Sequence, residues 1–396
     1  MDADTAGTAA ARVGLGAWGI LIAIAIARFA FGYQLQTVAS LGPELTATFH
    51  LSFAALGSLV GAYMLPGIFA ALAWGFLAQM IGDRALLGGG IVLMALGSAA
   101  AALAGGPGGI AAARAAAGAG AVALTVMQAK VVADWFRGPR FLLTLGLTIG
   151  AFPIGIGTGQ LTQAPIADAW GWRAAFVAGA VPAGLAAAVL LVSWRNGRGA
   201  GRRSLGWPTR AESLLVLLAG LIWALYNAAF SAFLTYVPSL MARQAAPTWL
   251  TDLVMNAATW GNLPALLFGG AVAARFGAGR VFVVGTLVTM VAVAAIGLGS
   301  SPLLWGTLFG TVGAVHVGVI VAAGTLSARP ENRSVAMALF YTTYYAGYTL
   351  FPAICGWVAD RAGTPGGALV CGAVLSSLAL PCWFAHQRLA ARPVEN

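Results

Sequence analysis

The stretch IAIAIARFAFGYQLQ, residues 22–36, decides the fold, because it places an arginine near the middle of a long apolar segment. Its first half alternates with a period of two, as a strand does. However, the apolar run extends from Gly14 to about Ser40, which is several times the usual strand length and enough for a membrane-spanning helix. An arginine at the centre of such a helix costs about 2.5 to 3.5 kcal/mol on insertion scales, so Arg28 is expected to have a partner, a watery cavity or a ligand.

The composition extends this interpretation to the whole chain. Of 396 residues, 60% are hydrophobic and only 8% are charged, whereas soluble domains are about 25% charged. We therefore expect a polytopic membrane protein with lipid around it. The formal charge of +10 could suggest a nucleic-acid partner, but the basic residues lie in short loops rather than on one solvated face. No nucleic acid is expected, and the protein is expected to be a monomer.

Cofactor and metal sites are not indicated by the sequence. Cys355, Cys371 and Cys382 all fall in apolar segments and form no Cys-x-x-Cys pair, so neither a disulfide framework nor a metal site is expected. The stretch GLGAWG at residues 14–19 matches the dinucleotide fingerprint, but that motif needs a preceding strand and a βαβ unit. The amino terminus is not expected to be a cleavable signal, because its apolar run is too long and contains Arg28.

Apolar runs of about twenty residues predict twelve membrane-spanning helices. They lie near residues 14–40, 52–78, 85–104, 109–133, 141–163, 173–194, 212–240, 249–274, 281–300, 302–328, 335–357 and 366–386.

The arginines predict the orientation of these spans. With both termini in the cytoplasm, the loops on that side hold Arg84, Arg137, Arg140, Arg195, Arg198, Arg202, Arg203, Arg210, Arg275, Arg280, Arg329 and Arg333. The opposite loops hold only Arg173, Arg243 and Arg361. By the positive-inside rule, both termini are expected to be cytoplasmic and the protein to lie in the inner (plasma) membrane.

A basic, glycine-rich connection near the middle of the chain predicts two halves. A shift of 195 residues, from Pro43 to Pro238, aligns the ends of the first and seventh spans, and parallel repeats of this kind are known in transporters. The expected organisation is a tail at residues 1–13, a six-helix bundle at 14–194, a linker at 195–211, a second bundle at 212–388 and a tail at 389–396.

Residues 114–140, RAAAGAGAVALTVMQAKVVADWFRGPR, resemble the fourth helix of the major facilitator superfamily, with an arginine, spaced glycines and a final Asp-Trp-Phe turn. GWRAAFVAGAVP at residues 171–182 is similar to that family's entry into its sixth helix. The resemblance runs along the whole chain, and it implies an all-α fold of twelve transmembrane helices in two pseudo-symmetric six-helix bundles. The stretch LSFAALGSLVGAYMLPG, with VVADWF, further resembles the cyanate and nitroimidazole transporter branch.

The same resemblance implies a set of gating residues: Asp83, Arg84, Gly118, Gly120, Asp134 and Arg140. One departure affects this set. After its second helix the family usually has a glycine followed four positions later by an acid, whereas here Gly75 is followed by Gln79. The latch in this loop is therefore either weakened or rebuilt around Asp83, and the sequence leaves both open.

Deep ionisable side chains predict the substrate site. Arg28, Arg114 and His316 fall on the first, fourth and tenth spans, which line the central cavity in the superfamily. Arg28 and His316 lie near mid-span, where transporters bind substrate. A structural cross-link is the alternative for Arg28, a packed histidine for His316, and a structural or gating role for Arg114.

Polar and aromatic stripes extend the predicted site. Gly118, Thr125 and Gln128 follow Arg114 on one helical face, whereas Lys130 is nearly opposite and is expected to reach the membrane surface. Tyrosines at 341, 344, 345 and 348 have helical spacing, and their hydroxyls favour a wet cavity. The complete predicted substrate site is Arg28, Arg114, His316, Tyr33, Gln36, Gln128, Tyr226, Asn227, Asn256, Tyr341 and Tyr345.

The acidic residues predict the charge of the substrate, because none of the eleven lies at mid-span depth. Cation pumps usually place a carboxylate there, whereas arginine without a facing acid suits an anion. We expect a secondary transporter of a small, organic, monovalent anion. The alternatives are an efflux pump for neutral or weakly acidic metabolites or drugs, and a non-transporting sensor or scaffold.

Two further predictions follow from the scattered titratable residues. An enzyme is not expected, because His50, His316 and His386 are far apart in the chain and no deep acid pairs with a nucleophile. Any proton coupling is expected to run through His316, since it is the only deep side chain with an ordinary pKa near 6.5.

Overall fold

A computed structural model of the chain describes residues 15–136, 139–194 and 206–391. Within these ranges it is helical, with no strand. The helices are α1 (Leu15–Ser40), α2 (Gly42–Phe49), α3 (Phe53–Ala62), α4 (Gly67–Ile81), α5 (Asp83–Ala102), α6 (Pro107–Trp135), α7 (Pro139–Trp170), α8 (Trp172–Ser193), α9 (Arg210–Arg243), α10 (Thr248–Phe276), α11 (Ala278–Gly297), α12 (Pro302–Gly310), α13 (Val317–Leu326), α14 (Arg333–Ala362), α15 (Gly366–Ser377) and α16 (Ala379–Ala390).

Sharp glycine turns separate several of the long helices. Gly82, Gly171 and Gly277 have φ of 86°, 79° and 90°, a region that side chains other than glycine rarely adopt. They lie at the joins α4/α5, α7/α8 and α10/α11, where the chain reverses within one or two residues. These turns allow successive apolar helices to pack antiparallel.

Three of the expected spans consist of two helices each. The second span breaks at residues 63–66, between α3 and α4, and the tenth at residues 311–316, between α12 and α13. The last span continues from α15 into α16. Pro66 accounts for one break, because proline lacks the backbone N–H that would continue the helical hydrogen bonds.

Eight segments of the described chain are long and apolar enough to cross a membrane. They include the helices that contain Arg28 and Arg114. The other predicted spans coincide with α7, α10, α12 with α13, and α14. That these four segments cross the membrane stays a prediction, as does the total of twelve membrane-spanning helices.

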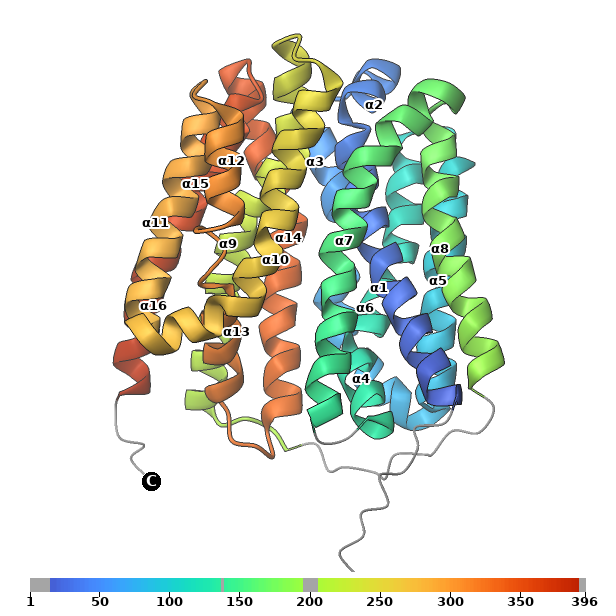
Figure 1. The fold of residues 1–396 in the computed structure, drawn as a ribbon, viewed down its shortest axis with the longest axis vertical. Coiled ribbons are helices and arrows are strands. Elements are labelled where there is room, and N and C mark those ends of the chain that lie inside the picture. Colours follow the sequence, from blue (N-terminus) through green and yellow to red (C-terminus); the bar gives the residue numbers. More distant parts are fainter. Residues whose placement is uncertain (1–14, 137–138, 195–205, 392–396) are drawn as a thin grey trace, which may run out of the picture.

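The helices form two groups that lie side by side, α1–α8 and α9–α16 (Figure 1). We call these the N-terminal and C-terminal groups. The end of the molecule at which α8 ends and α9 begins is called the linker end, and the end that carries α2 is called the far end (Figure 1). The exact domain bounds stay a prediction, and the two tails and most of the linker lie outside the described residues.

The two groups hold together mainly near the far end. Asp360 accepts hydrogen bonds from the backbone N–H groups of Phe53 and Ala54, at 2.8 and 3.0 Å. Tyr236 donates to the carbonyl of Phe53 at 3.0 Å, and Gln160 donates to Thr259, also at 3.0 Å. These four hydrogen bonds between the groups fall in this half of the molecule.

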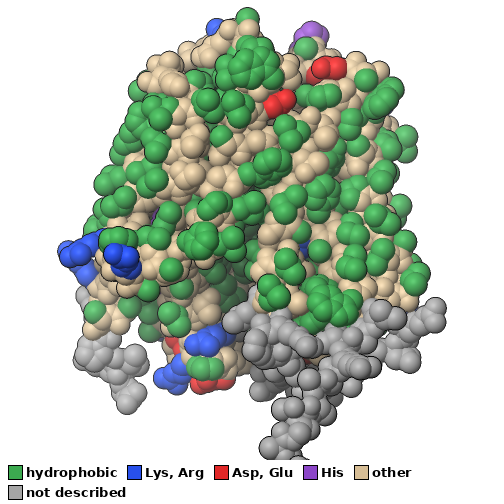
Figure 2. All heavy atoms as spheres, in the orientation of Figure 1, with side chains coloured by type: hydrophobic (Ala, Val, Ile, Leu, Met, Phe, Trp, Pro, Cys, Tyr) green, Lys and Arg blue, Asp and Glu red, His purple; other side chains and the backbone are tan. Residues whose placement is uncertain are grey.

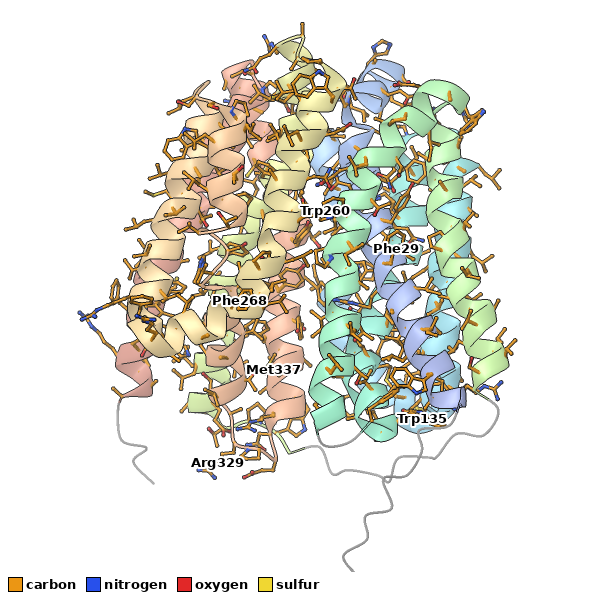
Figure 3. The ribbon with its side chains drawn as sticks, in the orientation of Figure 1. Phe29, Trp135, Trp260, Phe268, Arg329 and Met337 are labelled. Atoms are coloured by element: carbon orange, nitrogen blue, oxygen red, sulfur yellow. The ribbon has the colours of Figure 1, made fainter. Side chains whose placement is uncertain are left out.

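Close backbone packing reinforces the same seam. A side chain at Gly57 or Gly61 of α3 would collide with the carbonyls of Pro352 and Thr349 on α14. Trp260 lies at the seam between α10 and α7 (Figure 3), and its indole nitrogen occupies the space beside Gly157. Toward the linker end, Figure 2 shows the surface hollowed between the two groups. The arrangement is therefore closed at the far end and wider at the linker end.

Candidate substrate site

Arg28 lies at the middle of α1 and is half-buried. Its Nη1 donates to Thr125 Oγ1 of α6 at 3.3 Å. The guanidinium carbon lies 5.3 Å from the ring centre of Phe31 and 5.1 Å from that of Phe152, distances typical of cation–π contacts. Its Nε has no hydrogen-bond partner.

No carboxylate neutralises this arginine within the described ranges. The ion pairs formed there are Lys130 with Asp83, at 2.6 Å, and Arg329 with Glu212, at 3.9 Å. A cation in the middle of an apolar bundle is costly unless a counter-charge or a hydrated cavity compensates it. Arg28 therefore leaves an unused donor and an uncompensated positive charge beside the seam.

The tyrosines of α14 face this charge from the C-terminal group. Tyr345, Tyr341 and Tyr344 are the groups with which Arg28 interacts electrostatically across the seam. Tyr341 and Tyr344 are half-buried, whereas Tyr345 is 2% exposed. The structure thus places the predicted residues Arg28, Tyr341 and Tyr345 within electrostatic reach of one another.

An aromatic row leads from these tyrosines to His316. The ring centres of Tyr344 and Trp223 are 6.0 Å apart, those of Trp223 and Tyr226 are 5.5 Å apart, and those of Tyr226 and His316 are 5.1 Å apart. His316 also makes an edge contact with Phe282 at 5.4 Å.

His316 is therefore packed behind the aromatic row rather than facing Arg28 directly. It is 1% exposed, and its Nδ1 has no hydrogen-bond partner. It sits in the turn between α12 and α13, which interrupts the helix that the sequence analysis expected to continue through it. Its proposed role in proton coupling remains a prediction.

Arg114 has surroundings unlike those of Arg28. It is 2% exposed and lies 5.1 Å from the ring centre of Tyr63. Its guanidinium donates to the carbonyls of Leu59, Gln34, Leu35 and Val60, at 2.8 to 3.5 Å. Of the roles that the sequence leaves open for Arg114, these contacts favour the structural one, a cross-link of α6 to α1 and α3.

Most of the other predicted site residues are buried and use part of their hydrogen-bonding capacity locally. Tyr33 pairs with Thr162 at 3.0 Å, and Gln128 donates to Thr148 at 2.6 Å. Asn227 and Asn256 each donate to a backbone carbonyl of their own helix. Gln36 donates to Ser40 at 3.1 Å, and its Oε1 is buried without a partner. Substrate contacts by these residues stay a prediction.

The predicted gating residues separate into packing positions and linker-end charges. A side chain at Gly118 would collide with the carbonyl of Tyr63, and one at Gly120 with that of Gly90, so both glycines permit close helix packing. Asp83 pairs with Lys130 within the N-terminal group. Arg84 is exposed and Asp134 is half-buried, whereas the side chain of Arg140 lies outside the described residues. The gating roles stay predictions.

Several residues around Arg28 are not part of the site predicted from the sequence. Phe31 and Phe152 were missed because neither has a polar signal, and Phe152 is contributed by α7, a helix that the charge argument did not use. Thr125 and Tyr344 were present in the predicted stripes, so helical spacing from Arg114 and Tyr341 is the signal that could have found them.

Comparison with known proteins identifies the fold and the family. Residues 22–251 match the Major Facilitator Superfamily. An uncharacterised transporter of the same type from Enterobacter sp. (strain 638) is 29% identical over 147 residues, which is 36% of this chain and 37% of that protein. The matching part thus spans little more than a third of the relative's length.

Solved structures show the same fold at low identity. A bacterial homologue of the human lysosomal transporter Spinster, inward-facing and occupied, has a TM-score of 0.76 and 15% identity, with 95% of this chain and 98% of that chain covered. The xylose transporter XylE from E. coli, inward open, has a TM-score of 0.75 and 14% identity, with 93% and 96% covered. The predicted all-α membrane fold is confirmed, and the chain belongs to the major facilitator superfamily.

Proposed function

We propose that this protein is a secondary active transporter that moves a small, organic, monovalent anion across the inner membrane by alternating access. The observation that carries the proposal is Arg28, which lies at the middle of α1 with an unpartnered Nε and no ion pair. An anion is the ligand that would use its free donor and compensate its charge, and guanidinium groups bind carboxylates through paired hydrogen bonds. The phenols of α14 supply further donors on the opposite group.

The closed far end and the wider linker end support the alternating-access part of this proposal. If the linker end is cytoplasmic, as the arginine distribution predicts, this arrangement corresponds to the inward-facing state named for the Spinster homologue and XylE. Substrate would reach Arg28 between the groups from that side. The resemblance to the cyanate and nitroimidazole branch also suggests a small substrate, and we keep it as a proposal.

The test compares anion binding by the wild type, Arg28→Ala and Arg28→Lys. Thermal unfolding of the purified proteins with small carboxylates, their amides and matching amines identifies which class stabilises the wild type. Losing a desolvated charge pair should weaken anion binding by about 2 to 5 kcal/mol. Lysine should restore little of this affinity, because it lacks the planar fork. Unchanged affinity in a folded Arg28→Ala protein would contradict the proposal.

A neutral or weakly acidic substrate is the second candidate, because the row from Tyr344 to Tyr226 gives the site an aromatic wall. Benzoate and benzamide have the same ring but differ in charge. Stabilisation by benzoate alone, lost in Arg28→Ala, supports the anion. Equal stabilisation by both, retained in Arg28→Ala, supports the efflux alternative.

A further inference from the structure

A cavity of about 240 Å³ lies between the two groups near the far end. The N-terminal group lines it with residues from α1, α2 and α7, and the C-terminal group with residues from α9 and α10. Arg28 is not among its lining residues. A ligand held here would therefore contact both groups at once, away from Arg28.

Three carboxylates line this cavity: Glu44, Asp168 and Asp252. None of them forms an ion pair with a described lysine or arginine. The three arginines of the far end have other partners. Arg173 donates to the carbonyl of Ala104, Arg243 donates to that of Gly363, and Arg361 lies over the ring of Trp357. Figure 2 shows acidic side chains near the seam at this end. The cavity is therefore negatively charged.

The negative charge of the cavity affects the protonation of Glu44. It lies on the short helix α2, where burial, assisted by the nearby charge of Asp168, raises the pKa of its carboxyl group. The N–H of Trp172 donates to Glu44 Oε1 at 3.1 Å and opposes the increase. A bound cation would favour the ionised carboxylate and offset the cost of its burial.

Two buried amide side chains, those of Gln36 and Gln160, also line this cavity. Gln36 is 1% exposed and Gln160 is 4% exposed. Their amide nitrogens donate to Ser40 and Thr259, at 3.1 and 3.0 Å, while both Oε1 atoms lack a partner. A buried acceptor without a donor costs about 1 to 3 kcal/mol. A ligand with several N–H donors would satisfy these oxygens as well as the carboxylates.

The apolar residues that line the rest of the cavity indicate which class of cation fits. Leu41, Pro43, Pro238 and Met255 give the cavity apolar sides, which would not solvate a bare ion. In the described parts of the chain, no group of three acidic, histidine or cysteine side chains is arranged to hold a metal ion. Carboxylates beside apolar side chains suit an ammonium group that carries a short hydrocarbon chain.

We propose that this far-end cavity binds a small organic ammonium ion, whose three N–H groups donate to acceptors chosen from the carboxylates and the orphaned amide oxygens of Gln36 and Gln160. Because Glu44 and Asp252 belong to different groups of helices, the ligand holds the far end closed. A ligand that prefers one conformation shifts the population toward it. The site is independent of the anion site proposed at Arg28.

The test measures thermal unfolding of the purified full chain with n-butylammonium chloride, with 1-butanol and potassium chloride as matched controls. Butylammonium alone should raise the unfolding temperature in a saturable way. The double variant Glu44→Gln/Asp252→Asn should weaken the apparent affinity by at least about tenfold, because it removes two charge-assisted hydrogen bonds. Glu331→Gln, a neutralisation at the exposed linker end, should leave the response intact.

Two further measurements separate the ammonium site from the anion site, and a lipid headgroup from a free amine. Arg28→Ala should retain the butylammonium response, so that failure of the anion proposal does not affect this test. Mixed micelles with phosphatidylethanolamine distinguish a lipid headgroup from a free amine as the source of the ammonium group. The proposal is overturned if butylammonium gives no saturable shift, or if the double variant responds with the affinity of the wild type.

Discussion

Arg28 and Arg114 lie in the same group of helices, yet their guanidinium groups have opposite surroundings. Arg114 is 2% exposed and donates to several backbone carbonyls, whereas Arg28 makes one weak hydrogen bond at 3.3 Å and has an unpartnered Nε. A residue whose donors are used by the fold contributes to stability. A residue whose donors are free is available to a ligand.

This contrast predicts different effects of Arg114→Gln and Arg28→Gln. Each hydrogen bond to a charged group contributes about 1.5 to 3 kcal/mol, so Arg114→Gln should lower the unfolding temperature by several degrees. Arg28→Gln should change stability little and weaken anion binding. Thermal unfolding of both variants with and without the anion checks this, and a stable Arg114→Gln protein with lost anion affinity would reverse the assignment.

His316 carries the remaining prediction at this scale. A protonated imidazole would add positive charge behind the aromatic row and strengthen anion binding, so anion and proton would each favour binding of the other. An imposed pH gradient should therefore drive anion accumulation in liposomes by the wild type and much less by His316→Gln. Equal accumulation by the two proteins would show that His316 only packs against Tyr226 and Phe282.

At the scale of elements, the contact between α3 and α14 is the one that most directly holds the far end closed. Asp360 of α14 accepts hydrogen bonds from Phe53 and Ala54 at the start of α3. These N–H groups have no partner within their own helix, and the positive end of the helix dipole favours the carboxylate. The contact exists only while the two groups adjoin at this end.

Asp360→Asn should therefore weaken far-end closure, because an amide keeps one acceptor and loses the charge. We expect faster thiol labelling of a cysteine introduced at Met255, a buried position of α10 that lies between the two groups. Glu331→Gln, which removes a charge at an exposed position of the linker end, is the matched control and should leave this rate unchanged. Slower or equal labelling in Asp360→Asn would contradict a gating role.

The elements also show what the sequence could and could not predict. Hydropathy located the long helices, because each needs about twenty apolar residues to cross a membrane. It missed α2 and the break at residues 63–66, since a window of that length averages over short helices and turns; Pro43 and Pro66 are the local signals. The far-end cavity was missed because Glu44, Asp168 and Asp252 are far apart in the chain and line one cavity only when the two groups pack.

At the scale of the whole molecule, the predicted motion is a rocking of the two groups about a centre near Arg28. Four hydrogen bonds between the groups lie toward the far end, so opening that end breaks a defined set of contacts. Closure at the linker end must supply others. In Figure 3, Met337 of α14 lies in the half of the molecule nearer the linker, where the groups diverge.

Spin labels at two pairs of exposed positions would report this motion. Met80 of α4 and Leu326 of α13 mark the linker end, and Trp170 of α7 and Trp249 of α10 mark the far end. In a protein with its native cysteines replaced, Asp360→Asn should shorten the linker-end distance and lengthen the far-end distance together, because rigid groups exchange one closed end for the other. Butylammonium should shift both distances the opposite way. A change at one end alone would mean local opening rather than alternating access, since a two-state equilibrium must move both pairs in the same proportion.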